Sequence, residues 1–422
     1  MQFKHRIAVV GGRPAPVHGA RELGIDVVLL HGEGQFDPRE AEDHVTQIIT
    51  TDITDTDKVL AALEPLHRER PFDRILTTTE LSAVTVGEVN AKLGLPGTDP
   101  QVSRTIQDKY LTRAALEKAG LSPVRYRVVS SVSEAEEFLA EVGGRIVLKP
   151  SKGAGSFHIN MVDEASQIPS AFTAITEFGF GEVLAEEFLD GPIATVEAFS
   201  HNGRHVVLGT SEYQVNEHFV EWAISSPADL PPKALEDLSR LTGEILDAVG
   251  LENGPSHSEF VLTGQGPRLL ETHNRLSGSG IPELVHRSTG WDPARLFLTV
   301  PLGVDELPDE SPEPAGGAAI RYLRAEPGTV ESVEGLDGLD AKVIRLRKGE
   351  KPTHIIPHLK DLWGEKVGVV ISKSPGDVVS ETDSCLECDR GYVVASAADR
   401  AAAERACREA DERIAFRMSP GK

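Results

Sequence analysis

Three stretches of this sequence contain residues whose types and spacing suit phosphate and carboxylate chemistry. In the first, RIVLKPSKGAGSFHINM (residues 145–161), an apolar run ends in Lys149, and a loop of glycines and serines precedes a second apolar run. Short apolar runs on both sides of glycines predict a β-hairpin. Backbone N–H groups in such a turn can bind an anion, and Lys149 adds a positive charge. We interpret the stretch as a hairpin that folds over nucleotide phosphates. An ordinary surface hairpin fits these residues about as well. The stretch is not a P-loop, because no Gly-Lys-Ser/Thr sequence opens a helix.

The second stretch is GPSHSEFVLTGQGPRLLETHNRLSGSG, which reads as two apolar strands joined by a glycine turn. Glu259 lies at the start of one strand and Glu271 ends the next, so both carboxylates are expected near the open end of a hairpin. With His273 and Asn274 beside them, they form a set of hard ligands suited to Mg²⁺ that holds phosphates. The planar guanidinium of Arg275 suits a phosphate or a developing oxyanion. The alternative is a charged hairpin end paired by salt bridges.

The third stretch is VLAEEFLDG, in which two carboxylates interrupt an apolar strand. Burying a carboxylate is costly unless it meets a partner. The amino group of an adenine would be such a partner for Glu186, with the strand backbone contacting the ring nitrogens. A glutamate on an edge strand that faces solvent is the alternative.

Composition limits the classes of function. A chain of 422 residues is expected to form about three domains. The net charge of −23 argues against a nucleic acid or an anionic membrane as partner, but it does not exclude ATP bound with a metal. Three cysteines fit a reducing compartment, and no apolar leader or long apolar run is present, so we expect a cytoplasmic protein. Cys385 and Cys388 form a lone CxxC, which is too few ligands for a zinc site.

The first part of the chain, residues 1–98, alternates short β-branched runs with helical patterns. This alternation predicts an α/β domain with a Rossmann-like parallel sheet covered on both faces. No G-x-G-x-x-G motif follows Gly11, so a nicotinamide cofactor is not expected. Pro96 and Pro100 mark the end of this domain.

Residues 99–120 form a helical connector, in which the pattern predicts one continuous helix over 102–119 that contains Lys109. A small α/β unit with the glycine hairpin, a central β-rich unit and a C-terminal β-rich module follow, at residues 121–187, 188–303 and 304–422. The module begins with an acidic, proline-rich linker. We expect its strands to be antiparallel, with a terminal helix from about 397 to 415.

The order of these features resembles the ATP-grasp superfamily of carboxylate–amine ligases over roughly residues 5–300. IQDKYLTR matches the first phosphate lysine, Lys109, and IVLKPSKGAGS matches the second, Lys149, with the mobile glycine loop. VLAEEFLDGP matches the adenine hinge, and HSEF with LLETHNR matches the metal carboxylates and the arginine. The C-terminal module further resembles the L-amino-acid ligase branch. The resemblance implies an ATP-grasp fold with a mobile α+β lid and a central antiparallel sheet.

The resemblance also implies roles for individual residues. Catalytic roles fall to Arg275 and Lys149, and Mg²⁺ (two ions, with Mn²⁺ as an alternative) falls to Glu259, Glu271, His273 and Asn274. The implied ATP-binding residues are Lys109, Lys149, Ser151, Gly153, Gly155, Ser156, Glu186, Glu187, Phe188, Leu189 and Glu197.

Two departures from the family pattern affect these assignments. Ile193 stands where relatives often carry a ribose-binding glutamate, and Glu197 is a substitute from further along the strand. E-T-H-N-R replaces E-x-N-x-R, which leaves open whether His273 or Asn274 acts as the ligand.

The implied reaction joins a small-molecule carboxylate to an amine, with ADP as product. The carboxylate attacks the γ-phosphate of ATP, and the amine then displaces phosphate from the acyl phosphate under a closed lid. Such a ligase needs no nucleic-acid or membrane partner, and relatives are often homodimers. A ligase or carboxylase of nucleotide metabolism is the alternative, and it predicts a basic cluster in the first domain, where Arg13, Arg21 and His18 are sparse. A nucleotide-binding protein without catalysis would lack a metal carboxylate or the arginine, yet Glu259, Glu271 and Arg275 are all present.

Overall fold

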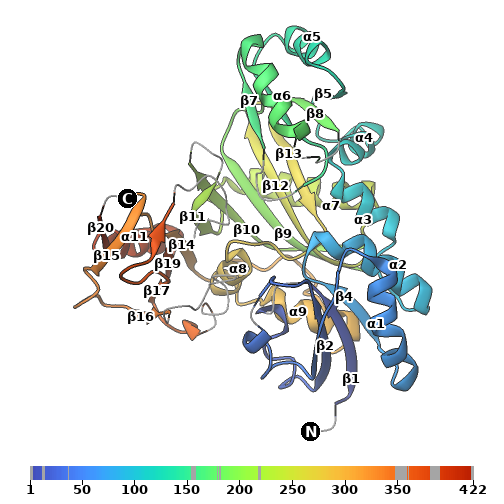
Figure 1. The fold of residues 1–422 in the computed structure, drawn as a ribbon, viewed down its shortest axis with the longest axis vertical. Helices are drawn as coiled ribbons and strands as arrows, with labels where there is room; N and C mark the ends of the chain where they lie inside the picture. Colours follow the sequence, from blue (N-terminus) through green and yellow to red (C-terminus); the bar gives the residue numbers. More distant parts are fainter. Residues whose placement is uncertain are drawn as a thin grey trace.

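The structure is a computed structural model that describes residues 3–11, 15–36, 38–153, 158–177, 179, 182–216, 220–346, 359, 361–380 and 390–419. Gly155, Ser156 and the Cys385/Cys388 pair lie outside the described residues. Figure 1 shows a small sheet at the top, the N-terminal domain at the lower right and the C-terminal strands at the left, all around a long central sheet. Among the described helices, none is long and apolar enough to cross a membrane.

The N-terminal domain confirms the predicted parallel α/β arrangement. Its sheet has the order β3-β2-β1-β4, from strands β1 (His5–Val10), β2 (Ile25–His31), β3 (Gln47–Thr50) and β4 (Arg74–Thr77). Helices α1 (Thr56–Glu69) and α2 (Ala83–Leu93) pack on one face, and the other face shares a core with the central part of the chain. Between β1 and β2, where a helix was compatible with the pattern, the described residues form only the 3₁₀ turn η1 (Ala15–Val17). Two further 3₁₀ turns are η2 (Pro38–Glu40) and η3 (Glu80–Ser82).

The connector contains two helices, so the prediction of one continuous helix was wrong. Helix α3 (Pro100–Gln107) ends and α4 (Lys109–Ala119) begins at Asp108, whose backbone is extended. The Asp108 carboxylate accepts hydrogen bonds from the N–H groups of Tyr110 and Leu111, which satisfies donors that a helix start leaves free. The break places Lys109 at the N-terminus of α4.

The small sheet at the top of Figure 1 confirms the predicted glycine hairpin. It has the order β5-β8-β6-β7, and Ile146 of β6 pairs with Val162 of β7 in antiparallel fashion. The strands are β5 (Tyr126–Val129), β6 (Ile146–Pro150), β7 (Asn160–Val162) and β8 (Val183–Glu187). Helices α5 (Val132–Val142) and α6 (Ile168–Glu177) cover one face through an apolar core, with the 3₁₀ turn η4 (Ala165–Gln167) before α6.

The central sheet has nine strands in the order β13-β12-β9-β10-β11-β14-β19-β17-β16. Its first half comprises β9 (Ile193–His201), β10 (Arg204–Val215), β11 (Glu221–Ser226), β12 (Gly254–Thr263) and β13 (Gly266–His273). Its second half comprises β14 (Gly317–Tyr322), β16 (Lys342–Arg345), β17 (Val367–Ile371) and β19 (Gly391–Ala397). The packing helices are α7 (Pro232–Val249), α8 (Ile281–Thr289), α9 (Pro293–Thr299) with the 3₁₀ turn η5 (Val300–Leu302), and α11 (Arg400–Asp411).

The C-terminal strands continue the central sheet, because β14 pairs with β11. The module was expected to be antiparallel throughout, and this was wrong for one pair, since β16 and β17 run parallel. The terminal helix is shorter than expected, because the chain turns after α11 into β20 (Ala415–Ser419). That strand pairs with β15 (Gly328–Glu334), which also pairs with β18 (Val378–Val379).

Candidate active site

The first predicted phosphate lysine is tied to the base of the glycine loop. The Lys109 N–H donates to the Ser151 carbonyl at 2.8 Å, and Lys109 Nζ donates to the Gly153 carbonyl at 2.9 Å. Nζ also lies 3.2 Å from Glu271 Oε2. Burial would lower the pKa of Lys109, but the Glu271 and Glu80 carboxylates raise it, which keeps the ammonium charged. Lys109, Ser151 and Gly153 are therefore brought together, as predicted.

The second lysine belongs to a buried group of three charged side chains. Lys149 Nζ lies 2.7 Å from Glu186 Oε2, and Arg113 contacts the same carboxylate through Nε at 2.7 Å and Nη2 at 3.1 Å. These side chains are at most 5% exposed. Burial alone would raise the pKa of Glu186, but Arg113 and Lys149 lower it to about 2. Glu186 is thus the counter-ion of two protein cations, which differs from both the predicted adenine contact and the solvent-facing alternative.

The predicted hinge residues next to Glu186 are held by the flanking strands. Glu187 accepts a hydrogen bond from Arg125 Nε at 2.9 Å, and the two side chains form a partly exposed ion pair. The Phe188 N–H donates to the Arg145 carbonyl, and the Arg145 guanidinium lies 4.8 Å from the Phe188 ring centroid. Leu189 is the second residue after β8. The hinge is therefore a fixed backbone segment, and its contact with adenine stays a prediction.

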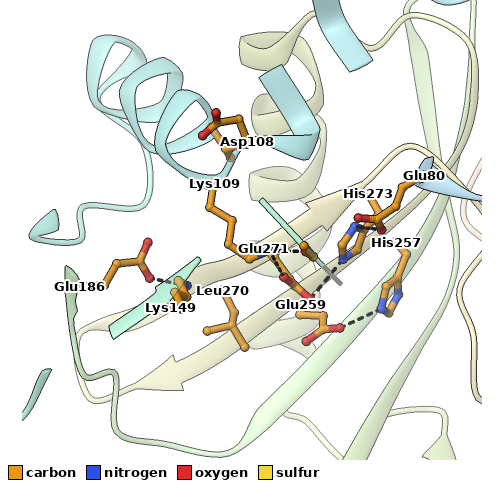
Figure 2. Close-up of polar contacts among 12 residues, drawn as sticks. Glu80, Asp108, Lys109, Lys149, Glu186, His257, Glu259, Leu270, Glu271 and His273 are labelled. Atoms are coloured by element: carbon orange, nitrogen blue, oxygen red, sulfur yellow. Dashed lines mark hydrogen bonds and ion pairs between the residues drawn. The ribbon is translucent and has the colours of Figure 1, made fainter. Parts of the chain in front are cut away.

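The two predicted metal carboxylates face each other across neighbouring strands. Glu259 on β12 and Glu271 on β13 are register partners, and Figure 2 shows them converging beside His273. One ligand atom from each of Glu259, Glu271 and His273 lies within 4.8 Å of the others. Burial would raise the pKa of Glu271, but Lys109 and His273 lower it well below its usual range, so its carboxylate is ionised. The two carboxylates therefore fit a hard divalent cation.

His273 and Arg275 meet at a carboxylate that the sequence analysis did not single out. Glu80 Oε2 lies 2.9 Å from His273 Nδ1 and 3.1 Å from Arg275 Nε. His273 Nε2 lies 3.1 Å from Glu271 Oε1, so each ring nitrogen faces a carboxylate. Burial would raise the pKa of Glu80, but His273 and Arg275 lower it to about 2. The N-terminal domain thus supplies the anion that holds the predicted catalytic arginine.

Glu197 does not lie at the hinge, and its predicted contact with the ribose is not supported. It is four residues along β9 from Ile193, about 13 Å in an extended strand. Its Oε1 lies 2.6 Å from His257 Nδ1, and its Oε2 accepts from the Ser277 hydroxyl at 2.6 Å. The structure therefore places Glu197 beside the metal carboxylates.

His257 connects Glu197 to Glu259, because its Nε2 lies 3.0 Å from Glu259 Oε1. Burial would lower the pKa of His257, but the Glu197 and Glu259 carboxylates raise it to about 10. The ring therefore carries a positive charge between two carboxylates. The other oxygen of Glu259 accepts from the Tyr213 hydroxyl at 2.5 Å.

Asn274 has a hydrogen-bond partner in helix α3, and its predicted role as a metal ligand stays a prediction. Its Nδ2 donates to Ser103 Oγ at 3.0 Å. Successive side chains of an extended segment point to opposite faces, and His273 takes the face of Glu271. Of the two candidates in E-T-H-N-R, His273 is the one that contacts Glu271.

Sequence reasoning missed Glu80, Arg113 and His257. Glu80 could have been found, because it follows the end of strand β4, and ligands of α/β sheets bind outside the carboxyl ends of strands. His257 precedes Glu259 by two residues, so the alternation of a strand places both on one face. Arg113 lies one helical turn after Lys109, which is also the spacing of an ordinary solvated helix face.

Comparison with known proteins finds matches to both the N-terminal domain and the central part of this chain. Family models match residues 17–97 as an ATP-grasp N-terminal domain and residues 142–283 as an ATP-grasp domain. The chain is 23% identical to the alanine–anticapsin ligase of Bacillus subtilis over 263 residues. This alignment covers 56% of this chain and 56% of that relative, so the chain matches little more than half of its length.

Solved structures match over the whole chain. An L-amino acid ligase from Bacillus licheniformis has a TM-score of 0.80 at 19% identity, covering 99% of this chain and 100% of that one. An N5-carboxyaminoimidazole synthetase from Staphylococcus aureus has a TM-score of 0.70 at 17% identity, covering 98% of each chain. The two family matches and the curated relative show that the chain belongs to the ATP-grasp superfamily of carboxylate–amine ligases.

Proposed function

We propose that this protein is an ADP-forming ligase that joins the carboxylate of one amino acid, or of a similar substrate, to the amine of another. The observation that carries the proposal is the convergence of Glu259 and Glu271, on strands β12 and β13, with Lys109 (Figure 2). Arg275 lies close by, because it and His273 contact the same carboxylate, Glu80. This arrangement collects a cation site, a phosphate-binding charge and an oxyanion-binding charge within one site. The L-amino acid ligase and the alanine–anticapsin ligase, both named for ligating amino acids, support the choice of substrate class.

The residues of the site divide the work of binding ATP. Lys109 and Lys149 supply the positive charges for the phosphates, and the N–H groups of the glycine loop are expected to contact the same oxygens. Glu259 and Glu271 would hold Mg²⁺, which when bound adds positive charge beside the phosphates. His273 orients Glu271 in this scheme, because both of its ring nitrogens already face carboxylates.

The chemistry proceeds in two displacement steps. An oxygen of the substrate carboxylate attacks the γ-phosphorus, the bond to the β,γ-bridging oxygen breaks, and an acyl phosphate and ADP result. The neutral amine of the second substrate then attacks the acyl carbon, and phosphate leaves as the amide forms. Both steps depend on alignment and on neutralised charge, so neither requires a nucleophilic side chain.

Arg275 is placed to stabilise the oxyanion of the second step. Its Nε contacts Glu80 and its Nη1 donates to the Leu276 carbonyl at 3.1 Å, so the guanidinium is held at two points. A held guanidinium needs little rearrangement as negative charge develops on the acyl oxygen.

The alternative in nucleotide metabolism gains little from the described residues. A ribosyl phosphate substrate calls for free basic side chains in the N-terminal domain. Arg21 instead donates to the carbonyls of Glu42 and Val45, and His18 contacts the Glu40 carbonyl. Arg13 lies outside the described residues. A protein without catalysis is disfavoured by the complete set of Glu259, Glu271 and Arg275.

The test is formation of ADP from ATP and Mg²⁺ with pairs of amino acids, with the coupled product identified by mass. ADP that appears only with certain pairs, together with the matching condensed mass, supports the proposal. AMP as the nucleotide product would exclude the acyl-phosphate route. ADP formed only with bicarbonate or a ribosyl amine would favour the alternative in nucleotide metabolism.

Arg275→Ala should abolish formation of the coupled product while ATP binding is retained. The matched control is Arg268→Ala on the preceding strand β13, since Arg268 Nη1 donates to nearby carbonyls of the hairpin turn. Unchanged turnover in Arg275→Ala would remove the assigned role.

A further inference from the structure

We propose that His257 and Glu197 are positioning residues that fix the metal carboxylate Glu259 and connect it to the loop after Arg275. The inference rests on the proposed function, because it takes Glu259 as a ligand of the divalent cation. Neither residue would touch the cation or the substrate in this scheme. Their effect would pass through the orientation of Glu259.

A continuous chain of short polar contacts carries this proposal. The Ser277 hydroxyl donates to Glu197 Oε2 at 2.6 Å, and Glu197 Oε1 lies 2.6 Å from His257 Nδ1. His257 Nε2 then lies 3.0 Å from Glu259 Oε1. All four residues are at most 8% exposed, so water does not compete for these contacts. A planar ring clamped at one nitrogen presents the other in a fixed direction, and this fixes the carboxylate that it contacts.

The contacts on Glu259 leave it able to bind a cation. An ionised carboxylate has about four lone-pair sites on two oxygens. His257 uses one site on Oε1, and the Tyr213 hydroxyl uses one on Oε2. One lone-pair site on each oxygen therefore remains for the cation, while His257 and Tyr213 hold the two oxygens in place.

The same arrangement occurs a second time on the neighbouring strand. Glu80, His273 and Glu271 form a carboxylate–histidine–carboxylate series with contacts of 2.9 and 3.1 Å. His257 and His273 are register partners, and their rings stack with centroids 5.9 Å apart at 11°. Each metal carboxylate thus has a histidine behind it that is itself held by a further carboxylate. Partners of this kind orient metal ligands, and their loss typically weakens metal affinity 10–100-fold.

Ser277 gives the chain a functional connection. It lies two residues after Arg275, the residue proposed to stabilise the oxyanion. A shift of this loop on substrate binding would reach Glu259 through Glu197 and His257. The structure therefore predicts that binding of the divalent cation and binding of the amino acid depend on each other.

The test measures binding of Mn²⁺ by electron paramagnetic resonance in the presence of ADP, so it does not depend on turnover. His257→Phe keeps a planar ring but removes both nitrogens, and Mn²⁺ affinity should fall 10–100-fold. His257→Gln keeps an amide near the position of Nε2 and should recover part of that loss. The matched control is His205→Phe on the same sheet, since His205 also contacts a serine and a carboxylate, Ser200 and Asp247, at a different place. The control should bind Mn²⁺ as the wild type does.

Ser277→Ala provides a milder variant if His257→Phe does not fold. It should raise the KM of the amino acid and remove the mutual dependence of Mn²⁺ and amino-acid binding. Wild-type Mn²⁺ affinity in folded His257→Phe, or intact mutual dependence in Ser277→Ala, would overturn the inference. Glu259→Gln separates the two proposals. If it abolishes Mn²⁺ binding while His257→Phe does not, only this inference fails, whereas unchanged Mn²⁺ binding in Glu259→Gln would refute the cation site itself.

Discussion

Replacing Glu186 by glutamine separates two roles for this carboxylate. As the counter-ion of Lys149 and Arg113, Glu186 stabilises the small sheet before any nucleotide binds. If Glu186 instead binds the amino group of adenine, its loss should affect the protein only when ATP is present. Glutamine keeps the shape and one acceptor oxygen but removes the charge, so the variant changes the electrostatics with little change in packing.

The expected magnitude follows from the contacts. Three side chains at most 5% exposed share contacts of 2.7–3.1 Å, and removing one partner of such a buried group costs about 3–5 kcal/mol. A local loss of this size should speed hydrogen exchange of the β6 and β8 amides roughly 100-fold or more, at 1.36 kcal/mol per factor of ten. Burial lowers the pKa of Lys149, and the Glu186 carboxylate counteracts part of this effect. Without Glu186 the pKa of Lys149 should therefore fall further, so that less of its positive charge is available to bind phosphate.

The control is the adjacent carboxylate. Glu187 pairs with Arg125, which is 55% exposed, so Glu187→Gln should cost only ~0–1 kcal/mol. The pH dependence has a defined sign, because the folded-state pKa of Glu186, about 2, is below its usual value of 4.5. The stability that Glu186 contributes is complete above about pH 4.5 and is lost as the pH falls towards 2. The difference between wild type and Glu186→Gln should shrink over that range.

Hydrogen exchange without nucleotide and calorimetric titration with ATP and GTP decide between the roles. Faster exchange in β6 and β8 in Glu186→Gln, and little change in Glu187→Gln, supports the counter-ion role. Unchanged exchange together with a lost preference for ATP over GTP would refute it and restore the adenine interpretation.

Two further predictions concern residues that position the site. Asp108→Ala removes the cap at the start of helix α4, which should lower the free energy of unfolding by about 0.5–2 kcal/mol. Because Lys109 would be displaced, the KM for ATP should rise, and steady-state kinetics would show this. Asp55→Ala removes an equivalent cap on α1 and should leave that KM unchanged, and equal effects of both variants would contradict the reasoning. Glu80→Gln should lower kcat about 10–100-fold with correctly folded protein, because Arg275 loses the anion that holds it, and wild-type kcat would show that this contact is dispensable.

The sequence predicted those parts of the fold that local patterns determine. The hairpin around Lys149 and the parallel N-terminal sheet follow from short apolar runs between glycines, and both are present. The break at Asp108 was not predicted, because the helical pattern continues across it. Its cause is tertiary, since Asp108 forms a β-bridge with Lys152, and the neighbouring Lys109 N–H donates to Ser151.

The candidate site shows the same limit. Sequence motifs singled out Lys109, Lys149, Glu259 and Glu271, but they did not identify the side chains that these residues contact. Arg275 meets Glu80 across 195 positions, and Glu186 meets Arg113 across 73. Such pairs leave no trace in periodicity, because each member reads locally as an ordinary charged residue. The adenine assignment for Glu186 was made without knowledge of the cation that already satisfies it.

Under the proposed function, the charges of the assembled site give a divalent cation a specific task. The site contains the carboxylates of Glu80, Glu186, Glu197, Glu259 and Glu271, and its positive charges come from Lys109, Arg113, Lys149, Arg275 and the His257 ring. Both lysines already contact carboxylates, so the positive charge that they offer a triphosphate is partly compensated. Adding a triphosphate to such a site brings further negative charge into a region of low exposure, where repulsion is strong. A divalent cation between Glu259 and Glu271 would reverse the sign at the point where the phosphates must lie. In the proposed function, the fixed histidines behind those carboxylates would orient the two ligands of that cation and so set its position against the phosphates.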